Sequence, residues 1–233
     1  MKFVLVIPAR GGSKRIPLKN IKDLAGKPLI MHTVDYALKF FSPEDIYVST
    51  DSPEIKQVVE ASGVQIIDRP AELSGDYTTT AAVLQHASQV IKSRGVDYDY
   101  MVLLQCTNPC RPINMMTDCM KIITDNNYTC LVGVTRSWNK FGKIQNNCYV
   151  PWNYKFGQRS QDLEPLYFEN GLVYITCRSL IEGGGIIDEH PYPYEIDSKY
   201  GLVDIDTYED FEFAQFKIMK MAQEETASLL PTE

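Results

Sequence analysis

The stretch Val4-Leu-Val-Ile-Pro-Ala-Arg-Gly-Gly-Ser-Lys-Arg-Ile-Pro-Leu-Lys-Asn20 decides how the rest of the chain is interpreted. The run from Lys2 to Ile7 is mostly apolar and rich in β-branched residues, which predicts a buried strand of a parallel sheet. The strand ends at Pro8, and the pair Gly11-Gly12 follows it. Because glycine has no Cβ, the backbone of this pair can approach a ligand closely.

Four cations stand in the same loop: Arg10, Lys14, Arg15 and Lys19. Glycine amides and cations at the end of a strand predict a site for a polyanion, here a triphosphate. The loop is neither a Walker A sequence, since it lacks G-x-x-x-x-G-K-[ST], nor a dinucleotide fingerprint G-x-G-x-x-G. The alternative is a surface turn with solvated cations, but loops at the carboxyl ends of parallel strands are where such sheets bind ligands.

Composition narrows the class of protein. At 233 residues, 44% hydrophobic and 23% charged, the chain predicts one α/β core. The net charge of −7 argues against nucleic acid as a partner. No apolar run approaches the ~20 residues that span a bilayer and no signal-peptide pattern opens the chain, so we expect no membrane partner and a cytoplasmic location. The six cysteines lack metal-site spacing and predict free thiols.

Apolar runs alternate with segments of helical period along the chain, which predicts a Rossmann-like, mostly parallel sheet with helices on both faces. The predicted strands after the first are 46–50, 64–67, 100–104, 129–135 and 168–176, and the predicted helices are 28–40, 53–62, 79–93, 113–125 and 208–222.

A second polar motif lies near the end of the chain. Leu202, Val203 and Ile205 predict a short strand whose period of two places Asp204 and Asp206 on the same side. Two adjacent carboxylates need a cation, and oxygen ligands of this kind suit Mg²⁺, which also binds phosphate oxygens. We therefore predict Asp204 and Asp206 as metal ligands; capping of the last helix by Asp206 is a compatible role.

The residues Ile7 to Lys14, Lys19-Asn20 and Gly26-Lys-Pro-Leu-Ile30 closely resemble the opening of the acylneuraminate cytidylyltransferases, which make CMP-activated sialic acids and related nine-carbon acidic sugars. The resemblance implies a core of the nucleotide-diphospho-sugar transferase type and CTP as the nucleotide. It also implies nucleotide contacts from the loop, namely Ala9, Arg10, Gly11, Gly12, Ser13, Lys14, Lys19 and Asn20.

Two further segments resemble the same family. Asp68 to Thr80 is similar to R-P-x-x-L-s-x-D-x-[ST]-x-[ST], which implies nucleotide or sugar contacts for Arg69, Thr78 and Thr80. The alternative is a capped loop alone, in which Asp76 and the threonines cap the following helix. Gln105 to Pro112 is similar to L-L-Q-P-T-S-P-L-R, which implies site positions for Gln105, on both nucleotide and sugar, and for Arg111.

The remaining resemblance concerns the sugar side and the domains. Residues 136–165 are rich in aromatic and polar residues and show little helical or strand period. The resemblance implies that they form a small dimerisation subdomain that completes the sugar site of the partner chain, where Lys143 and Arg159 would bind the carboxylate of the sugar. The strand at 168–176 is similar to N-G-a-i-Y-I, which implies sugar contacts for Asn170 and Tyr174. We thus predict a core of 1–135 and 166–223, the 136–165 subdomain, and a frayed tail at 224–233.

Together these features predict an Mg²⁺-dependent cytidylyltransferase. A sugar hydroxyl attacks the α-phosphorus of CTP, pyrophosphate leaves, and Lys19, Arg10 and Asp206 are catalytic. We expect a homodimer, with sialic, legionaminic and pseudaminic acid all open as substrates. The alternatives are a nucleotidyltransferase with another nucleotide and sugar, a non-catalytic nucleotide-binding protein, or a metal-dependent glycosyltransferase using Asp204-x-Asp206, which would leave the basic loop without a purpose.

Overall fold

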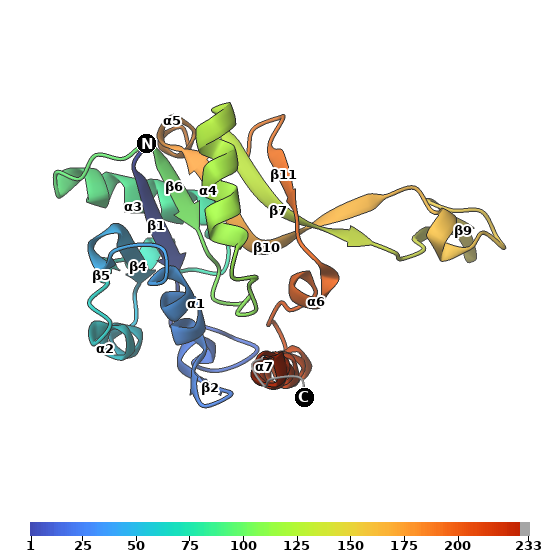
Figure 1. Cartoon of the computed structure of the whole chain (residues 1–233), viewed down its shortest axis with the longest axis horizontal. Helices are drawn as coiled ribbons and strands as arrows, with labels where there is room; N and C mark the ends of the chain where they lie inside the picture. Colours follow the sequence, from blue (N-terminus) through green and yellow to red (C-terminus); the bar gives the residue numbers. More distant parts are fainter. Residues whose placement is uncertain (229–233) are drawn as a thin grey trace.

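The computed structural model of the chain describes residues 1–228 and has a seven-stranded sheet at its centre, in the order β11-β7-β10-β6-β1-β4-β5 (Figure 1). Its strands are β1 (Phe3–Pro8), β4 (Ile46–Thr50), β5 (Gln65–Asp68), β6 (Tyr100–Leu103), β7 (Cys130–Ser137), β10 (Leu166–Cys177) and β11 (Tyr192–Glu195). Strand β10 pairs antiparallel with β6 and β7, and the other pairs of this sheet are parallel. The predicted mostly parallel sheet is therefore confirmed.

Helices cover both faces of the sheet, as predicted. They are α1 (Leu29–Ala37), α2 (Pro53–Glu60), α3 (Thr80–Ser93), α4 (Met115–Asn126), α5 (Arg178–Glu182), α6 (Ser198–Gly201) and α7 (Tyr208–Ser228), with 3-10 turns at Lys19–Ile21 (η1), Pro43–Asp45 (η2), Ala71–Leu73 (η3) and Ser160–Asp162 (η4). Alternate residues of β1 face opposite layers: Leu5 and Ile7 belong to the cluster that includes α1, α2 and α4, and Val4 and Val6 to the one that includes α3 and α5. Burial on both sides explains why β1 is continuously apolar.

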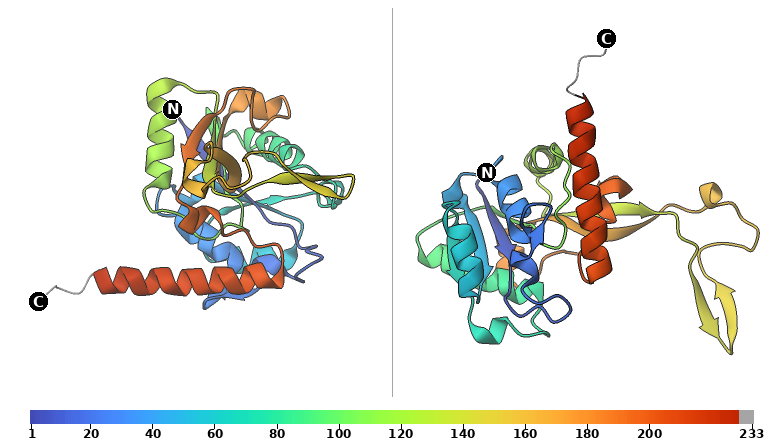
Figure 2. Two further views of the ribbon diagram at one scale, coloured as in Figure 1. Left: turned by 90° about the vertical axis from the view of Figure 1, so that its right-hand side faces the viewer. Right: turned by 90° about the horizontal axis from the view of Figure 1, so that it is seen from below.

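A third apolar cluster joins the two ends of the chain. Phe211 and Ala214 of α7 pack with Ile16 of the N-terminal loop, and Val203 and Ile205 lie in the same cluster. The small hairpin of β2 (Asp23–Leu24) and β3 (Lys27–Pro28) lies beside α7, which extends away from the body (Figure 2). Burial of these side chains therefore places the acidic segment next to the basic loop.

The prediction of a strand at 202–205 is wrong, although the side chains of this segment do alternate between buried and exposed. No strand forms between α6 and α7; instead Val203 and Ile205 are buried and Asp204 and Asp206 are exposed. The backbone is held by the loop after β6, since the Ile205 amide donates to the Thr107 carbonyl at 2.9 Å. The two carboxylates thus share a side without belonging to the sheet.

Residues 136–165 leave the body as an arm between β7 and β10 (Figure 1). Strands β8 (Gly142–Gln145) and β9 (Cys148–Pro151) form a hairpin in the arm, so this segment is more regular than the sequence predicted. Large apolar side chains of the arm are exposed, among them Ile144 (82%), Phe156 (74%) and Trp152 (64%).

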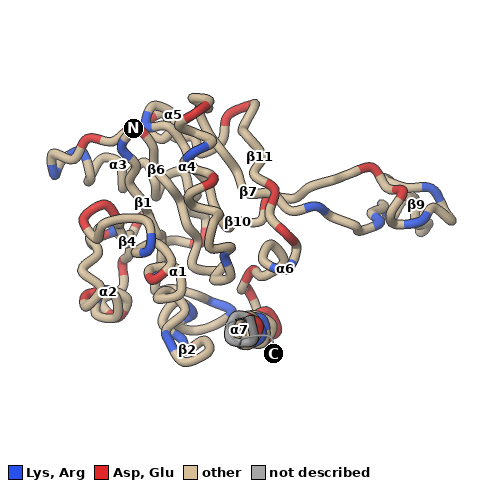
Figure 3. The backbone as a smooth tube through the Cα atoms, viewed as in Figure 1, with Lys and Arg blue, Asp and Glu red and all other residues tan. Residues whose placement is uncertain are grey.

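The end of α7 differs from prediction as well. The predicted helix 208–222 is too short, because α7 continues to Ser228. Part of the predicted tail at 224–233, residues 229–233, lies outside the described part of the chain. Within residues 1–228 we find no helix with the length and hydrophobicity required to cross a bilayer. Lys and Arg positions are interspersed with Asp and Glu in the view of Figure 3.

Candidate active site

Two adjoining cavities open at the carboxyl ends of β1, β5 and β6, with volumes of about 310 and 400 Å³. The predicted nucleotide residues that line the first are Arg10, Ser13, Lys19, Asn20, Arg69, Thr78, Thr80 and Gln105. Lys14 lines the second, and Asp206 closes it from the other end of the chain. The backbone at Ala9, Gly11 and Gly12 forms the loop itself. The structure therefore gathers residues from four separate segments around one space.

The loop after β1 is held by hydrogen bonds with two side chains, one from the loop after β4 and one from its own far end. The Gly11 amide donates to Asp51 Oδ1 at 3.0 Å, and Asn20 Nδ2 donates to the Arg10 carbonyl at 3.0 Å. A Cβ built on Gly11 would lie 2.8 Å from the Ser52 Cβ, whereas one on Gly12 would meet no atom within 4 Å. Packing against α2 therefore requires glycine at position 11 alone, and Ser52, not Asp51, caps α2.

Gly11→Ala is expected to raise the KM for the nucleoside triphosphate by about tenfold or more, because the new Cβ pushes the loop off Ser52 and small misplacements of binding groups are costly. Gly12→Ala is the matched comparison, with a much smaller expected change. Initial rates over a triphosphate titration, with circular dichroism to confirm folding, test this prediction. Equal effects of the two substitutions would contradict it.

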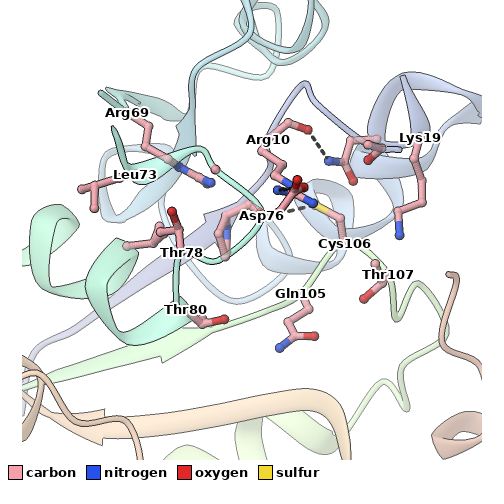
Figure 4. A pocket seen from close by; sticks show the side chains of 15 residues that line it. Arg10, Lys19, Arg69, Leu73, Asp76, Thr78, Thr80, Gln105, Cys106 and Thr107 are labelled. Atoms are coloured by element: carbon pink, nitrogen blue, oxygen red, sulfur yellow. Dashed lines mark hydrogen bonds and ion pairs between the residues drawn. The ribbon is translucent and has the colours of Figure 1, made fainter. Parts of the chain in front are cut away.

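The cations of the loop are paired with two carboxylates that are distant in sequence. Arg10 Nη1 lies 3.1 Å from Asp76 Oδ1 (Figure 4), and Lys14 binds the other Asp76 oxygen. Arg15 Nη1 and Lys19 Nζ lie 3.0 and 3.3 Å from the two oxygens of Asp206. The hydrogen bond from Lys14, assisted by Arg10, lowers the pKa of the Asp76 carboxyl, which is therefore ionised at neutral pH.

Of the residues that the alternative interpretation offered as caps of α3, a threonine fills this role and Asp76 does not. The N-cap of α3 is Thr79, whose side chain accepts a hydrogen bond from the Ala82 amide at 3.2 Å. Asp76 is instead turned toward the cations of the β1 loop, which it can reach because β1 and β5 are parallel strands of one sheet and their loops leave it at the same edge. Sequence spacing carries no signal for this contact.

The wall of the first cavity combines a buried cation with apolar side chains. Arg69 is 7% exposed and its Nε donates to Ser49 Oγ at 3.2 Å; burial lowers its pKa. Leu73 and Val83 add an apolar surface that the sequence analysis missed. Burial raises the pKa of Cys106 to about 12, so this lining thiol is not a nucleophile at neutral pH.

The carboxylates of Asp204 and Asp206 are close enough to influence each other. Desolvation raises the pKa of Asp204, while a hydrogen bond with Thr107 lowers it and the charge of Asp206 raises it again. Within residues 1–228, no three His, Cys, Asp or Glu residues gather as a metal site. Asp206 lines the second cavity and Asp204 lines neither of the two. Mg²⁺ commonly uses one or two carboxylates together with phosphate oxygens and waters, so this donor set fits the ion.

The family model described as "Cytidylyltransferase" matches residues 4–228, which covers the fold, both cavities and the acidic pair. The chain belongs to this cytidylyltransferase family. The pseudaminic acid cytidylyltransferase of Campylobacter jejuni is 33% identical over 97% of this chain and 100% of its own length. The N-acylneuraminate cytidylyltransferase of Streptococcus agalactiae is 32% identical over 91% of this chain, which spans about half (52%) of that protein's length.

A solved structure supports the fold independently. A CMP:2-keto-3-deoxy-manno-octonic acid synthetase, solved in complex with CTP, matches with a TM-score of 0.69 at 19% identity, covering 96% of this chain and 100% of its own. At this identity the likeness shows that both share a Rossmann-like fold.

In this member of the cytidylyltransferase family, Arg111 supports the site without lining it. The side chain is 9% exposed and donates to the carbonyls of Leu172 and Gln105 at 3.1 and 2.7 Å and to Thr33 Oγ1 at 3.0 Å. Burial lowers its pKa to about 10. These bonds fix the backbone that presents Gln105, so Arg111 takes the site position that the resemblance implied as a structural cation behind the cavity.

Of the predicted sugar contacts, Gln105 alone lines either cavity among the described residues. Asn170 is buried, with its amide donating to Thr135 Oγ1, and the Tyr174 hydroxyl donates to Glu169 at 3.1 Å. Lys143 lies on the exposed strand β8, and Arg159 pairs with Asp162 within the arm. In a single chain, the arm thus holds the two predicted carboxylate-binding cations apart from the cavities.

Proposed function

We propose that this chain transfers the cytidylyl group of CTP to a nine-carbon sugar acid, releasing pyrophosphate, with Mg²⁺ as cofactor. The observation that carries the proposal is the pairing of Arg15 and Lys19 with Asp206 at the rim of the cavities. It brings triphosphate-binding cations and a carboxylate pair into one site, as an attack on the α-phosphorus requires. Sugar acids are proposed because the relatives described above are named for them.

Each residue then has a role in the displacement. Arg10, Lys14 and Lys19 bind the phosphates and stabilise the charge that develops on the departing pyrophosphate. Asp204 and Asp206 would hold Mg²⁺, which supplies positive charge at the α-phosphate and lowers the pKa of the attacking hydroxyl. The sugar oxygen bonds to the α-phosphorus, the bond from this phosphorus to the β-phosphate oxygen breaks, and the hydroxyl proton passes to solvent. Gln105 orients the sugar or the base through its amide.

We further propose a cytoplasmic homodimer in which the arm completes the sugar site of the partner chain. Lys143 and Arg159 lie on the arm outside this chain's cavities, and exposed apolar side chains such as Trp152 and Phe156 are typical of an interface. All six cysteines, which lie within the described residues, are free thiols, in keeping with a reducing compartment. Light scattering in solution measures the oligomeric state, and a monomer would contradict this part.

The decisive experiment incubates the protein with each nucleoside triphosphate, Mg²⁺ and a panel of sialic, legionaminic and pseudaminic acids, with pyrophosphate release as the readout. We expect release with CTP and one or more of these acids, and none when Mg²⁺ is chelated. A metal-dependent glycosyltransferase would give no pyrophosphate from CTP without an acceptor glycan. Release with another triphosphate would indicate a different nucleotide and sugar pair.

A further inference from the structure

One carboxylate that lines the two cavities has no part in the proposed reaction. Asp206 has a role as a metal ligand, but Asp76 has none, and yet Asp76 lines both cavities. It lies in the segment from Arg69 to Thr80, and both of these residues also line the first cavity (Figure 4). An anion in the middle of an anion-binding site requires an explanation.

The geometry of Asp76 imitates that of a bound phosphate. Its two carboxylate oxygens are divided between two cations, Oδ1 with Arg10 and Oδ2 with Lys14, in the way that two oxygens of one phosphate group would be. Both cations belong to the β1 loop predicted to bind the triphosphate. A phosphate and the Asp76 carboxylate therefore cannot occupy this position together.

The pairs are also weak enough to exchange. The Asp76 side chain is 36% exposed, and those of Arg10 and Lys14 are 33% and 77% exposed. Ion pairs at such exposure contribute little to stability, because water screens them. A ligand that carries several negative charges can replace the carboxylate, whereas a singly charged ligand gains little over it.

We propose that Asp76 is an internal counter-ion that competes with ligand phosphates for Arg10 and Lys14, so that the site selects polyphosphates over ligands of lower charge. The proposal deepens the proposed function and rests on it for the identity of the ligand as a nucleoside triphosphate. When pyrophosphate leaves, Asp76 pairs with both cations again, and the site returns to its starting state. The opposite role is that Asp76 holds the two cations ready for phosphate, and it predicts the opposite effect of removing the charge.

The test titrates the full chain with inorganic tripolyphosphate and with orthophosphate by calorimetry. Asp76→Asn is expected to bind tripolyphosphate about three- to tenfold more tightly than wild type, as the removal of two partly exposed pairs predicts. It is also expected to lose part of the preference for tripolyphosphate over orthophosphate. Because these probes contain neither nucleoside nor sugar, the result is independent of whether the proposed reaction is correct.

Glu72→Gln is the matched control, since it removes the same charge from the same loop and the Glu72 side chain does not line the cavities. An equal gain in Glu72→Gln would show an effect of net charge only and would overturn the proposal. Unchanged or weaker binding in Asp76→Asn would overturn it too. Asp76→Ser, with thermal unfolding measured for each variant, keeps the test decisive if one substitution disturbs the fold.

Discussion

Lys19→Met is expected to lower turnover by about 10²- to 10³-fold, the cost of losing one electrostatic contact to the transition state of a phosphate transfer. The Lys19 side chain is only 11% exposed, and its ammonium donates to the Ile205 carbonyl and to Asp206 at the rim of the site. Methionine preserves the length and apolar stem of the side chain but removes the charge. Single-turnover rates with CTP and the accepted sugar acid measure the effect on chemistry.

The control for this prediction lies one turn away on the same segment. Lys22 Nζ lies 5.7 Å from the ring centroid of Tyr208 and 5.8 Å from that of Phe211, and Lys22 lines neither cavity. Lys22→Met therefore removes an equal charge that contributes to the docking of α7. We expect near-normal turnover for this variant. If Lys19→Met retains near-normal turnover as well, the loop does not bind the reacting phosphates.

Asp206→Asn is expected to abolish metal-dependent turnover, a loss of at least about 10³-fold, because the amide cannot replace a carboxylate as a charged metal ligand. The substitution also frees Arg15 and Lys19 from their shared partner, so binding of CTP in the absence of metal is expected to stay equal or become tighter. The combination of lost turnover and retained nucleotide binding separates a metal ligand from a merely structural residue. Rates over a Mg²⁺ titration and calorimetry with CTP measure the two quantities.

Glu209→Gln provides the comparison at the same end of the molecule. Glu209 is exposed in the first turn of α7 and carries the same charge three residues away. Its substitution should leave the Mg²⁺ dependence unaltered. Turnover in Asp206→Asn that persists at an unchanged Mg²⁺ requirement would remove this residue from the metal site.

Local patterns were sufficient for much of the fold and for one half of the site. The strand at 46–50 was predicted to the residue, because a short run rich in β-branched and aromatic residues stands there between residues typical of turns. The β1 loop was found because Gly11-Gly12 and four cations follow a strand at a proline. Each of these patterns lies within a few neighbouring residues, so it can be recognised without knowing how the rest of the chain folds.

The partners of those residues could not be predicted in the same way. The sequence left open whether Asp76 caps a helix, and the resemblance implied a site position for Arg111. In the structure Asp76 pairs with the basic loop, and Arg111 donates to backbone carbonyls behind the site. Both outcomes depend on which loops become neighbours when the strands align. From the sequence, a short polar side chain such as that of Asp76 could cap a helix, pair with a cation or bind a ligand. The packing of the folded chain decides which of these partners lies within reach.

The sequence was therefore enough to predict a mostly parallel α/β core, a loop of glycines and cations after its first strand and a carboxylate pair near its last helix. The packing of the whole chain was needed to show that these two motifs meet, and that Asp206 and Asp76 each pair with two of the four cations. Charged residues and the spacing of apolar residues can be recognised within a short segment of sequence. The apolar cluster of Ile16, Ile205 and Phe211, which brings the two ends of the chain together, forms only when residues distant in sequence are buried against one another.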